Sequence, residues 1–444
     1  MTTATAPRVV RELRATVTGR VIEPGDVDYD RARTVCYGID RRPAAVVRAR
    51  DAGDVARTVR LAREHDLELA VRSGGHSPAG HGTTDGGIVL DLAGLKGVEI
   101  DVRRRTAWAG AGLTAGEYTA ATAVHGLATG FGDTGSVGVG GITLSGGVGY
   151  LVRKHGLTID NLLAADVVNA DGELRRADPR THPDLFWAIR GGGGNVGVAT
   201  RFHYRLHEVD TVIGGTLVLP ATPRTLTRYL AEAQAAPEQL TSVVTVMPAG
   251  NGAFVLRATL VYAGGLRDGE RAVAPFRRLA EPISDTVGPA RYQDLLVPAG
   301  GEHQTWAHRT MFLDDVDVDA AGALLAGLRE SDSPMSLAQL RVLGGAMARV
   351  PADATAFAHR AAPILASVAA LDRHPGSREA WVDRAAGSLR PRGGAAAGFL
   401  GDEGRAGVRK AYPGRTWDRL AGVKRRYDPT NLFRLNQNVP PTDR

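Results

Sequence analysis

Glycine is concentrated in a few segments of this chain, and this clustering restricts the possible folds more than any other feature. Of the 56 glycines among 444 residues, many lie in the segments 73–97, 130–149 and 191–197. Nine of the twenty residues in 130–149 are glycine. Such a density fits neither a helix nor a packed strand, because glycine loses more conformational freedom on folding than other residues. It favours a backbone that lies flat against a large planar or anionic ligand.

The first glycine segment contains the run VRSGGHSPAGHG at 71–82, which follows a predicted strand at 67–73. Its glycines permit positive φ, so that successive N–H groups can turn into one concavity that suits a pyrophosphate. The run is not GxGxxG and no helix follows it, which disfavours a Rossmann dinucleotide fold. From spacing alone, His76 in this loop could be a hydrogen-bonding loop residue or a functional one.

The pattern of residues changes at about residue 208. Before about residue 208 the pattern opens as strand, helix and strand; afterwards the glycine clusters stop, and predicted strands alternate with amphipathic helices in the manner of an α+β domain. We expect residues 1–12 to be a loose tail. The early elements are predicted at 43–50, 51–65, 67–73, 86–94, 98–112 and 114–125. The later strands are predicted at 217–221, 242–249 and 254–264, and the later helices at 222–237, 268–282 and 320–332.

The predicted domain organisation is a first domain interrupted by a second. A helical segment in 184–200 ends in four glycines and reopens as a strand, and helices return after about residue 400. We therefore predict a cofactor domain at 1–208, an inserted substrate domain at 209–400 with an antiparallel sheet covered by helices, and C-terminal helices at 401–444 that return to the first domain.

Composition and charge exclude several function classes. The net charge is +6, but the arginines are spaced along helical stretches without interleaved aromatic residues, so nucleic acid is not an expected partner. The single cysteine excludes an internal disulfide. The N-terminus lacks the apolar core of a secretory signal and no apolar run approaches 18 residues, so we expect a cytoplasmic protein without a membrane span. There is no HExxH metal motif and no GxSxG nucleophile elbow.

Five motifs in order along the chain carry a resemblance to a known family. They are DRRPAAVVRARDAGDV, VRSGGHSPAGHG, GSVGVGGITLSGGVGYLVRKHGLTIDNLLAADVV, HPDLFWAIRGGGGNVGV and YDPTNLFRLNQNVP, between residues 40 and 440. Together they resemble the berberine-bridge-enzyme-like FAD-linked oxidoreductases of bacteria, which have the vanillyl-alcohol-oxidase (PCMH-type) fold. The resemblance implies a two-subdomain FAD-binding domain with an inserted α+β substrate domain.

The resemblance also implies roles for individual residues. His76 matches the histidine that is bonded covalently to the flavin 8α-methyl group. The other implied cofactor-binding residues belong to the pyrophosphate loop, the second glycine loop, one strand and a closing polar pair. They are Arg72, Ser73, Gly74, Gly75, Ser77, His81, Thr134, Gly135, Val137, Gly138, Gly140, Gly141, Gly146, Gly147, Val198, Asn436 and Asn438.

Two positions in the second glycine loop refine the expected chemistry. Many relatives attach FAD through a cysteine as well, three residues before a valine; here Thr134 stands at that position and Val137 is the valine. Cys36 lies about 100 residues upstream, in a different motif. We therefore predict a single covalent bond, through His76. A small valine at 137 resembles the oxygen-permissive form of the family, which favours an oxidase that uses O2 over a dehydrogenase.

The expected base is missing. Close relatives carry Tyr-x-Asn before Phe-Leu-Gly-Asp-Glu, where this chain has Ala396 and Gly398. Three explanations stay open: another residue supplies the base, the chemistry needs none, or the chain is an engineered or divergent variant with weak oxidase activity. Candidate catalytic residues are Gln339 and Arg341, which share one face of a predicted strand, and Tyr292, His303 and His308 in a predicted loop.

The predicted function is that of an FAD-dependent oxidase. It would remove a hydride from a small organic substrate (a sugar, an amine or a secondary-metabolite alcohol) to flavin N5, with O2 as acceptor and no metal. Two alternatives stay open because of Ala396: oxidative cyclisation or another tailoring step on a natural product, or a flavin-binding protein with little redox turnover. The substrate and the oligomeric state do not follow from the sequence.

Overall fold

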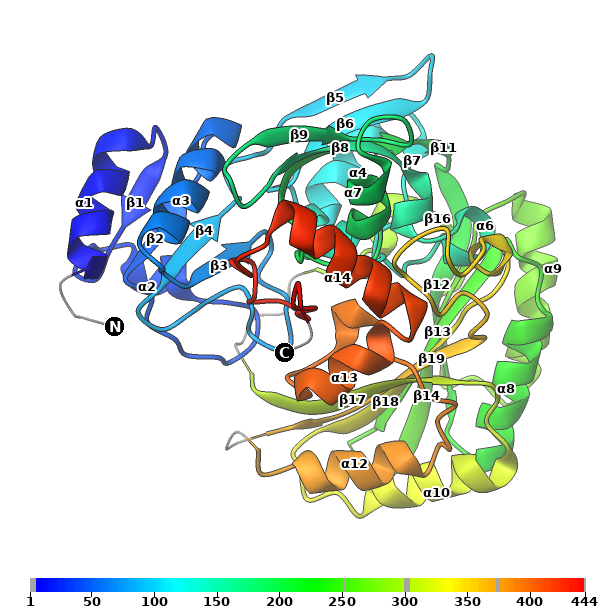
Figure 1. Ribbon diagram of the computed structural model, residues 1–444. Coiled ribbons are helices and arrows are strands. Elements are labelled where there is room, and N and C mark those ends of the chain that lie inside the picture. Colours follow the sequence, from blue (N-terminus) through cyan, green and yellow to red (C-terminus); the bar gives the residue numbers. More distant parts are fainter. Residues whose placement is uncertain (1–4, 251, 299–303, 373–375, 443–444) are drawn as a thin grey trace.

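The computed structural model describes residues 5–250, 252–298, 304–372 and 376–442. Within them the strands form sheets of four, five, two and eight strands. Figure 1 shows the four- and five-stranded sheets on one side of the molecule and the eight-stranded sheet on the other, with α13 (Gly404–Ala411) and α14 (Arg415–Tyr427) between them in this view. The mixed α+β class expected from the sequence is confirmed.

The four-stranded sheet has a parallel centre. Its order is β1 (Arg20–Ile22), β2 (Ala45–Arg48), β4 (Ile88–Asp91) and β3 (Leu69–Arg72), with β2, β4 and β3 parallel. A parallel pair needs a crossover, and helix α3 (Ala52–Glu64) supplies it between β2 and β3. The Asp51 carboxylate accepts the N–H of Asp54 and caps that helix.

The prediction of a loose N-terminal tail is wrong. Residues Thr5–Thr16 form helix α1. Val9, Val10 and Leu13 lie on one side of this helix, are buried, and belong to the core that also contains α3. An apolar stripe of three residues is short in sequence terms, but α3 covers it and thereby stabilises the helix.

The five-stranded sheet is antiparallel. Its order is β5 (Val98–Asp101), β6 (Thr106–Gly110), β10 (Val198–Arg205), β8 (Leu162–Val168) and β9 (Leu174–Ala177). Helix α4 (Ala115–Ala123) begins with a capping box between Thr114 and Glu117. Helix α7 (Pro183–Ile189) precedes β10, so the predicted helix that ends in four glycines and reopens as a strand is confirmed.

Short elements connect these sheets. The glycine-rich segment 130–149 contains helix α5 (Val139–Leu144), so the expectation that this run excludes a helix is wrong for six residues. The remaining short elements are α2 (Tyr29–Arg33), β7 (Leu127–Ala128), α6 (Val152–His155), β11 (His207–Glu208), α11 (Ala346–Arg349), and the 3-10 turns η1 (Thr158–Asn161), η2 (Tyr292–Leu295) and η3 (Ala397–Phe399).

The eight-stranded sheet is antiparallel and has helices on one face (Figure 1). Its strands, in spatial order, are β15 (Ser284–Asp285), β12 (Thr211–Pro220), β14 (Phe254–Tyr262), β13 (Leu240–Pro248), β18 (Ser336–Val342), β19 (Ile364–Leu371) and β17 (Trp306–Leu313), with β16 (Gly288–Arg291) also on β12. The helices are α8 (Pro223–Ala235), α9 (Leu266–Arg277), α10 (Val318–Arg329) and α12 (Glu379–Gly387).

The C-terminal helices share the core of the first two sheets. Val408, Trp417 and Leu420 belong to the same buried cluster as strands β2, β4 and β10. The helix-covered face of the eight-stranded sheet has a separate core. The domain boundaries at residues 208 and 400 stay a prediction.

Candidate active site

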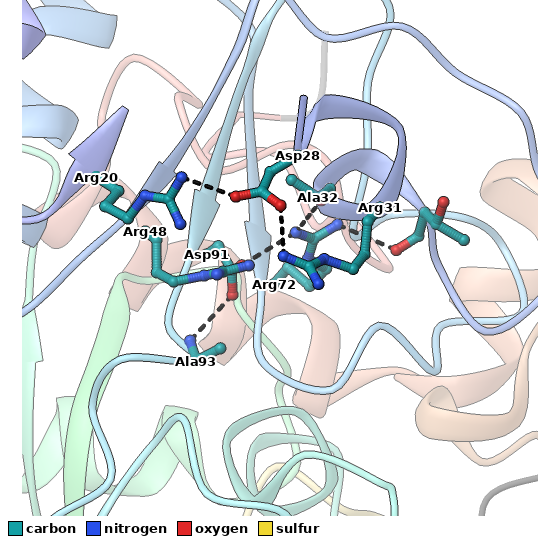
Figure 2. Close-up of polar contacts among 9 residues, drawn as sticks. Arg20, Asp28, Arg31, Ala32, Arg48, Arg72, Asp91 and Ala93 are labelled. Atoms are coloured by element: carbon teal, nitrogen blue, oxygen red, sulfur yellow. Dashed lines mark hydrogen bonds and ion pairs between the residues drawn. The ribbon is translucent and has the colours of Figure 1, made fainter. Parts of the chain in front are cut away.

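The carboxyl ends of the parallel strands carry a buried ion network. Arg48, Arg72 and Asp91 end β2, β3 and β4 in register. The Asp91 carboxylate accepts hydrogen bonds from Arg72 at 3.1 Å and from Arg48 at 3.2 Å, and Arg72 also donates to the carbonyls of Ala32 and Thr34 (Figure 2). The Arg72 guanidinium is therefore engaged inside the protein, and the loop that follows presents backbone groups.

That loop, residues 73–82, is the first predicted cofactor loop. Gly75 and Gly80 both have φ of +72°, a region that favours glycine. The Gly75 carbonyl accepts the N–H of Cys36 at 3.0 Å, and Ser77 accepts from the N–H groups of Gly80 and His81. The loop is thus fixed by its own backbone in a compact conformation.

The two glycine-rich loops touch backbone to backbone. A Cβ atom on Gly74 would lie 2.3 Å from the Gly138 nitrogen, and one on Gly138 would lie 2.1 Å from the Gly74 nitrogen. Ser73 lies at the same contact and donates to the carbonyl of Ala111 at 2.6 Å. No side chain fits at either position, so residues 74 and 138 must be glycine for lack of space.

His76 lies at this contact. Its Nε2 is 3.0 Å from the Ser136 hydroxyl of the second glycine loop. Burial lowers the pKa of His76, and a hydrogen bond to the backbone of Ser136 opposes that shift. A neutral imidazole with an available nitrogen lone pair is the form that can act as a nucleophile. Burial also lowers the pKa of His81, to about 4.

The segment around Thr134 is held by backbone contacts with Val297. Thr134 pairs with Val297, and the Gly135 N–H donates to the Val297 carbonyl at 2.8 Å. The Val137 carbonyl accepts the N–H of Ala115 at 2.8 Å. Thr134 and Val137 therefore lie on the same loop as Ser136, the partner of His76.

The later glycines of this loop have two separate requirements. Gly146 and Gly147 have φ of +118° and +76°. A Cβ on Gly147 would lie 2.0 Å from the Thr158 hydroxyl. Gly140 and Gly141 lie in helix α5, where a Cβ on Gly140 would meet Ala111 and Ser73, whereas one on Gly141 would meet nothing within 4 Å.

Asn195, which the sequence analysis did not single out, joins the third glycine segment to the C-terminal segment. Its side chain is buried and donates to the carbonyls of Gly192 at 2.7 Å and Gln437 at 3.0 Å. It also accepts the N–H of Val439 at 2.8 Å. Val198 follows at the start of β10. The sequence signal that could have identified Asn195 is its position directly after four glycines.

Asn436 and Asn438 each bury a side-chain oxygen without a hydrogen-bond partner among the described residues. The Asn436 amide group donates to the carbonyl of Phe433 at 2.8 Å. An unsatisfied buried acceptor costs about 1–3 kcal/mol, so these two oxygens suit a ligand with N–H donors. A glycine cradle together with these acceptors fits FAD, which carries an anionic pyrophosphate and a ring with an N–H group.

Gln339 and Arg341 on β18 share a face, as predicted, and are hydrogen bonded to each other. Arg341 also donates to the Asp133 carboxylate at 2.5 Å and lies 5.2 Å from the Phe399 ring. Gln339 donates to the Thr245 hydroxyl at 3.3 Å. Asp133, which the sequence analysis missed although it directly precedes Thr134, thus connects the second glycine loop to the eight-stranded sheet.

A small hollow adjoins this ion pair. Its lining includes Asp133, Tyr150, Arg341 and Thr241. The Thr241 hydroxyl is buried and has no partner among the described residues. Burial raises the pKa of Tyr150, and burial with the neighbouring Cys36 and Asp133 raises the pKa of Tyr37 to about 12. Both phenols are therefore protonated at neutral pH and can donate hydrogen bonds.

The remaining catalytic candidates lie apart. Tyr292 is not in an open loop: it begins η2, is buried in an apolar cluster, and burial raises its pKa. His308 lies on β17 rather than in a loop, and its Nε2 is 3.1 Å from the Phe399 carbonyl. Burial lowers the pKa of His308. His303 lies outside the described residues.

Apolar packing fills the region where the expected tyrosine and asparagine would stand. Ala396 is buried with Phe312, Phe357 and Leu343. A Cβ on Gly398 would lie 2.6 Å from the Ser145 hydroxyl. A larger pair of side chains at these positions would require their neighbours to move.

No group of three or more histidine, cysteine, aspartate or glutamate side chains is arranged to hold a metal ion in the described ranges. In the same ranges, no helix combines the length and apolar character needed to cross a bilayer.

Comparisons with known proteins match these observations. Residues 43–178 match the family model described as an FAD binding domain, and residues 401–440 match the model described as berberine and berberine like. An (R)-6-hydroxynicotine oxidase of Paenarthrobacter nicotinovorans is 33% identical over 96% of this chain and 97% of its own. An FAD-linked oxidoreductase of Dictyostelium discoideum is 29% identical, with 98% of each chain covered.

Solved structures show the same likeness. The crystal structure of 6-hydroxy-D-nicotine oxidase from Arthrobacter nicotinovorans has a TM-score of 0.88 at 30% identity, over 96% of this chain and 98% of that one. A chitooligosaccharide oxidase has a TM-score of 0.87 at 21% identity, over 99% and 100% of the two chains. At that identity the second likeness concerns the fold alone.

Proposed function

The chain belongs to the berberine-bridge-enzyme-like FAD-linked oxidoreductases, and from this premise we propose that it is an oxidase that binds FAD covalently through His76 alone. The observation that supports this most directly is the His76 imidazole, neutral and 3.0 Å from Ser136, at the contact of the two glycine loops. When bound, FAD would accept a hydride from a small organic substrate and pass the electrons to O2.

In this proposal the residues of the chain hold and orient the reactants. The backbone of 73–77 and 138–141 would hold the pyrophosphate, and Asn436 and Asn438 would satisfy their buried oxygens on the ring system. His81, Thr134, Gly135, Val137, Gly146, Gly147 and Val198 would line the same site. Arg341, fixed by Asp133, would orient the substrate through its guanidinium N–H donors.

Oxygen as the acceptor rests on Val137, because a small valine at this position resembles the oxygen-permissive form of the family. The substrate class is drawn from the relatives: one matched protein is named as a nicotine oxidase and several neighbours as carbohydrate oxidases. We propose a small molecule of that range, and the proposed cofactor and substrate domains are divided at residues 208 and 400.

A second candidate function follows from Ala396 and Gly398. Because apolar packing occupies the place of the expected proton acceptor, a tailoring reaction such as an oxidative cyclisation, with less demand for a base at that position, is the alternative. A substrate screen read by hydrogen peroxide release distinguishes the two, since a simple oxidase releases peroxide and an uncyclised ketone, aldehyde or imine.

Acid precipitation tests the covalent bond. We expect the purified protein to remain yellow after precipitation and washing, and His76→Ala to yield a colourless precipitate. His125→Ala is the matched control, because His125 is exposed and lies outside the glycine loops; it should stay yellow. A colourless wild-type precipitate would contradict the covalent bond, and colour that survives in His76→Ala would assign it to another residue.

A further inference from the structure

The eight-stranded sheet has one face that its helices do not cover. Along β13, β14 and β18, alternate residues such as Val244, Ala258 and Leu340 belong to the core under α8, α9, α10 and α12. Their neighbours must point the other way, since side chains alternate across a strand. Figure 1 shows the first two sheets and the C-terminal helices on that opposite side. We call this opposite side of the sheet the cavity face.

The strand register aligns five polar residues across the cavity face. Thr245 pairs with Arg257 on one side and with Gln339 on the other. Gln339 in turn pairs with Ser367, and Ser367 pairs with Thr310. Arg257, Thr245, Gln339, Ser367 and Thr310 therefore form a row across β14, β13, β18, β19 and β17, which we call the polar row. Directly opposed residues lie about 4.5–5.5 Å apart at Cβ, so one molecule can contact several of them.

Part of the polar row lacks partners within the protein. The Thr310 hydroxyl is buried, with 8% of the residue exposed, and makes no hydrogen bond among the described residues. The Thr241 hydroxyl, on the same face of β13, is in the same state. A buried polar group without a partner is rare in native proteins, so both hydroxyls indicate that a ligand or its associated water completes this face.

The charges on the cavity face are not balanced. The Arg341 charge is neutralised by Asp133. Arg257 is exposed and, within the described part of the chain, makes no ion pair or hydrogen bond. Arg257 is joined to the hollow through its neighbours: it pairs with Thr245, and Gln339 is hydrogen bonded both to Thr245 and to Arg341, which lines the hollow.

We propose that the cavity face binds a substrate that carries a carboxylate, with Arg257 as the anchor of that carboxylate and the hydroxyl and amide groups of the polar row as its neutral partners. A guanidinium presents two parallel N–H donors that match a carboxylate. The net positive charge of the face disfavours an ammonium group. This inference rests on the proposed oxidase function and specifies its substrate class.

Three probes of one shape and different charge test the proposal on the flavin-loaded protein. Benzoate, benzyl alcohol and benzylamine would be titrated by calorimetry and by the visible flavin spectrum. We expect benzoate to bind saturably and at least about tenfold more tightly than the alcohol, and benzylamine to bind weakest. Equal affinities for the three probes, or tighter binding of benzylamine, would overturn the proposal.

Two variants test whether Arg257 causes the difference in affinity between the probes. Arg257→Gln should weaken benzoate binding about tenfold and leave benzyl alcohol unchanged. Arg267→Gln is the matched control, because Arg267 is an exposed arginine on helix α9, which covers the other face of the sheet; it should change neither affinity. Equal effects of the two variants would show only general charge attraction and would contradict a site.

A further arm separates carboxylates from phosphates. Inorganic phosphate should not displace benzoate at equal concentration; if it binds more tightly and this binding is lost in Arg257→Gln, the anchored group is a phosphate and the carboxylate proposal fails. Yellow acid-precipitated protein and peroxide release are established first, so a failure of the proposed covalent flavin or of the oxidase activity is distinguishable from a failure at Arg257.

Discussion

The glycine loops and the cavity face meet at Asp133, but they are built from different parts of the chain. In the loops, the contacts are made by backbone atoms: Gly74 and Gly138 approach until no Cβ fits between them. On the cavity face, the contacts are made by side chains of strands that are distant in sequence, such as Thr245 and Gln339. We infer that the loops tolerate almost no substitution, whereas the cavity face can exchange side chains and change substrate without loss of the fold.

The largest expected effect compares two arginines, one from each region. Arg72→Ala removes the more deeply buried of the two arginine partners of the Asp91 carboxylate and leaves the Ala32 and Thr34 carbonyls without this donor; removing one partner of a buried pair costs up to about 3–5 kcal/mol. Arg257→Ala, at an exposed position without an ion pair, should change stability by less than about 0.5 kcal/mol. Urea unfolding of both variants measures the difference.

A double variant checks the reason for the Arg72 effect. Replacing both partners by leucine, as Arg72→Leu with Asp91→Leu, removes the uncompensated charge and should cost less than the sum of the two single changes. Additive losses would show that Arg72 stabilises the loop by packing alone. Similar stabilities of Arg72→Ala and Arg257→Ala would remove the contrast between the two regions.

A smaller effect is expected within the second glycine loop. Gly138→Ala introduces a Cβ 2.1 Å from the Gly74 nitrogen, and forced overpacking costs about 1–3 kcal/mol. We expect a lower Tm and a lower ratio of flavin to protein. Gly141→Ala, where a Cβ meets nothing within 4 Å, is the control and should retain both. Full flavin content in Gly138→Ala would mean that the loops can separate without loss of the site.

The sequence was informative about the loops because their requirements are local. Positive φ and close backbone approach demand glycine, so the positions of Gly75 and Gly147 are visible in a linear pattern. The N-terminal helix was missed because only three apolar residues, covered by α3, stabilise it. Asp133 was missed because it acts through Arg341, which lies more than 200 residues away; Asn195 was missed although it directly follows four glycines, because its contact with Gln437 is equally distant in sequence.

The cavity face was hard to predict for a different reason. The alternation in β18 correctly placed Gln339 and Arg341 on one face. The polar row, however, depends on the register between β13, β18, β19 and β17, and a shift of one residue would turn every side chain to the other face. Thr245, Ser367 and Thr310 have no local motif, so their alignment with Gln339 follows only from the folded sheet.

Two stacked histidines, one at the end of α6 and one at the start of β11, predict a dependence of stability on pH. His155 and His207 have ring centroids 3.8 Å apart. Burial, with nearby positive charge, lowers the pKa of His155 to about 3 and of His207 to about 4. In the unfolded chain both histidines have a pKa of about 6.5. The stability that the neutral pair contributes is therefore present above pH 6.5, and it is lost as the pH falls towards 4 and then 3.

We therefore expect Tm to fall continuously between pH 7 and pH 5, and His155→Phe to reduce the slope while it preserves the ring stack. His125→Phe, at an exposed position, should leave the slope as it is in the wild type. Identical slopes for wild type and His155→Phe would place the acid sensitivity elsewhere. The flavin-to-protein ratio, measured at each pH, shows whether the glycine loops or the cavity face loosens first.

The smallest expected effect is at Cys36, which lies beside the first glycine loop and donates its N–H to Gly75. Burial raises the pKa of its thiol, so the nucleophilic thiolate is disfavoured at neutral pH. Cys36→Ser keeps the backbone contact and should leave Tm within about 1 °C, an effect of a few tenths of a kcal/mol. The acid-precipitated variant should stay as yellow as the wild type. A loss of acid-stable colour would mean that the covalent bond depends on Cys36, and the assignment of that bond to His76 alone would be wrong.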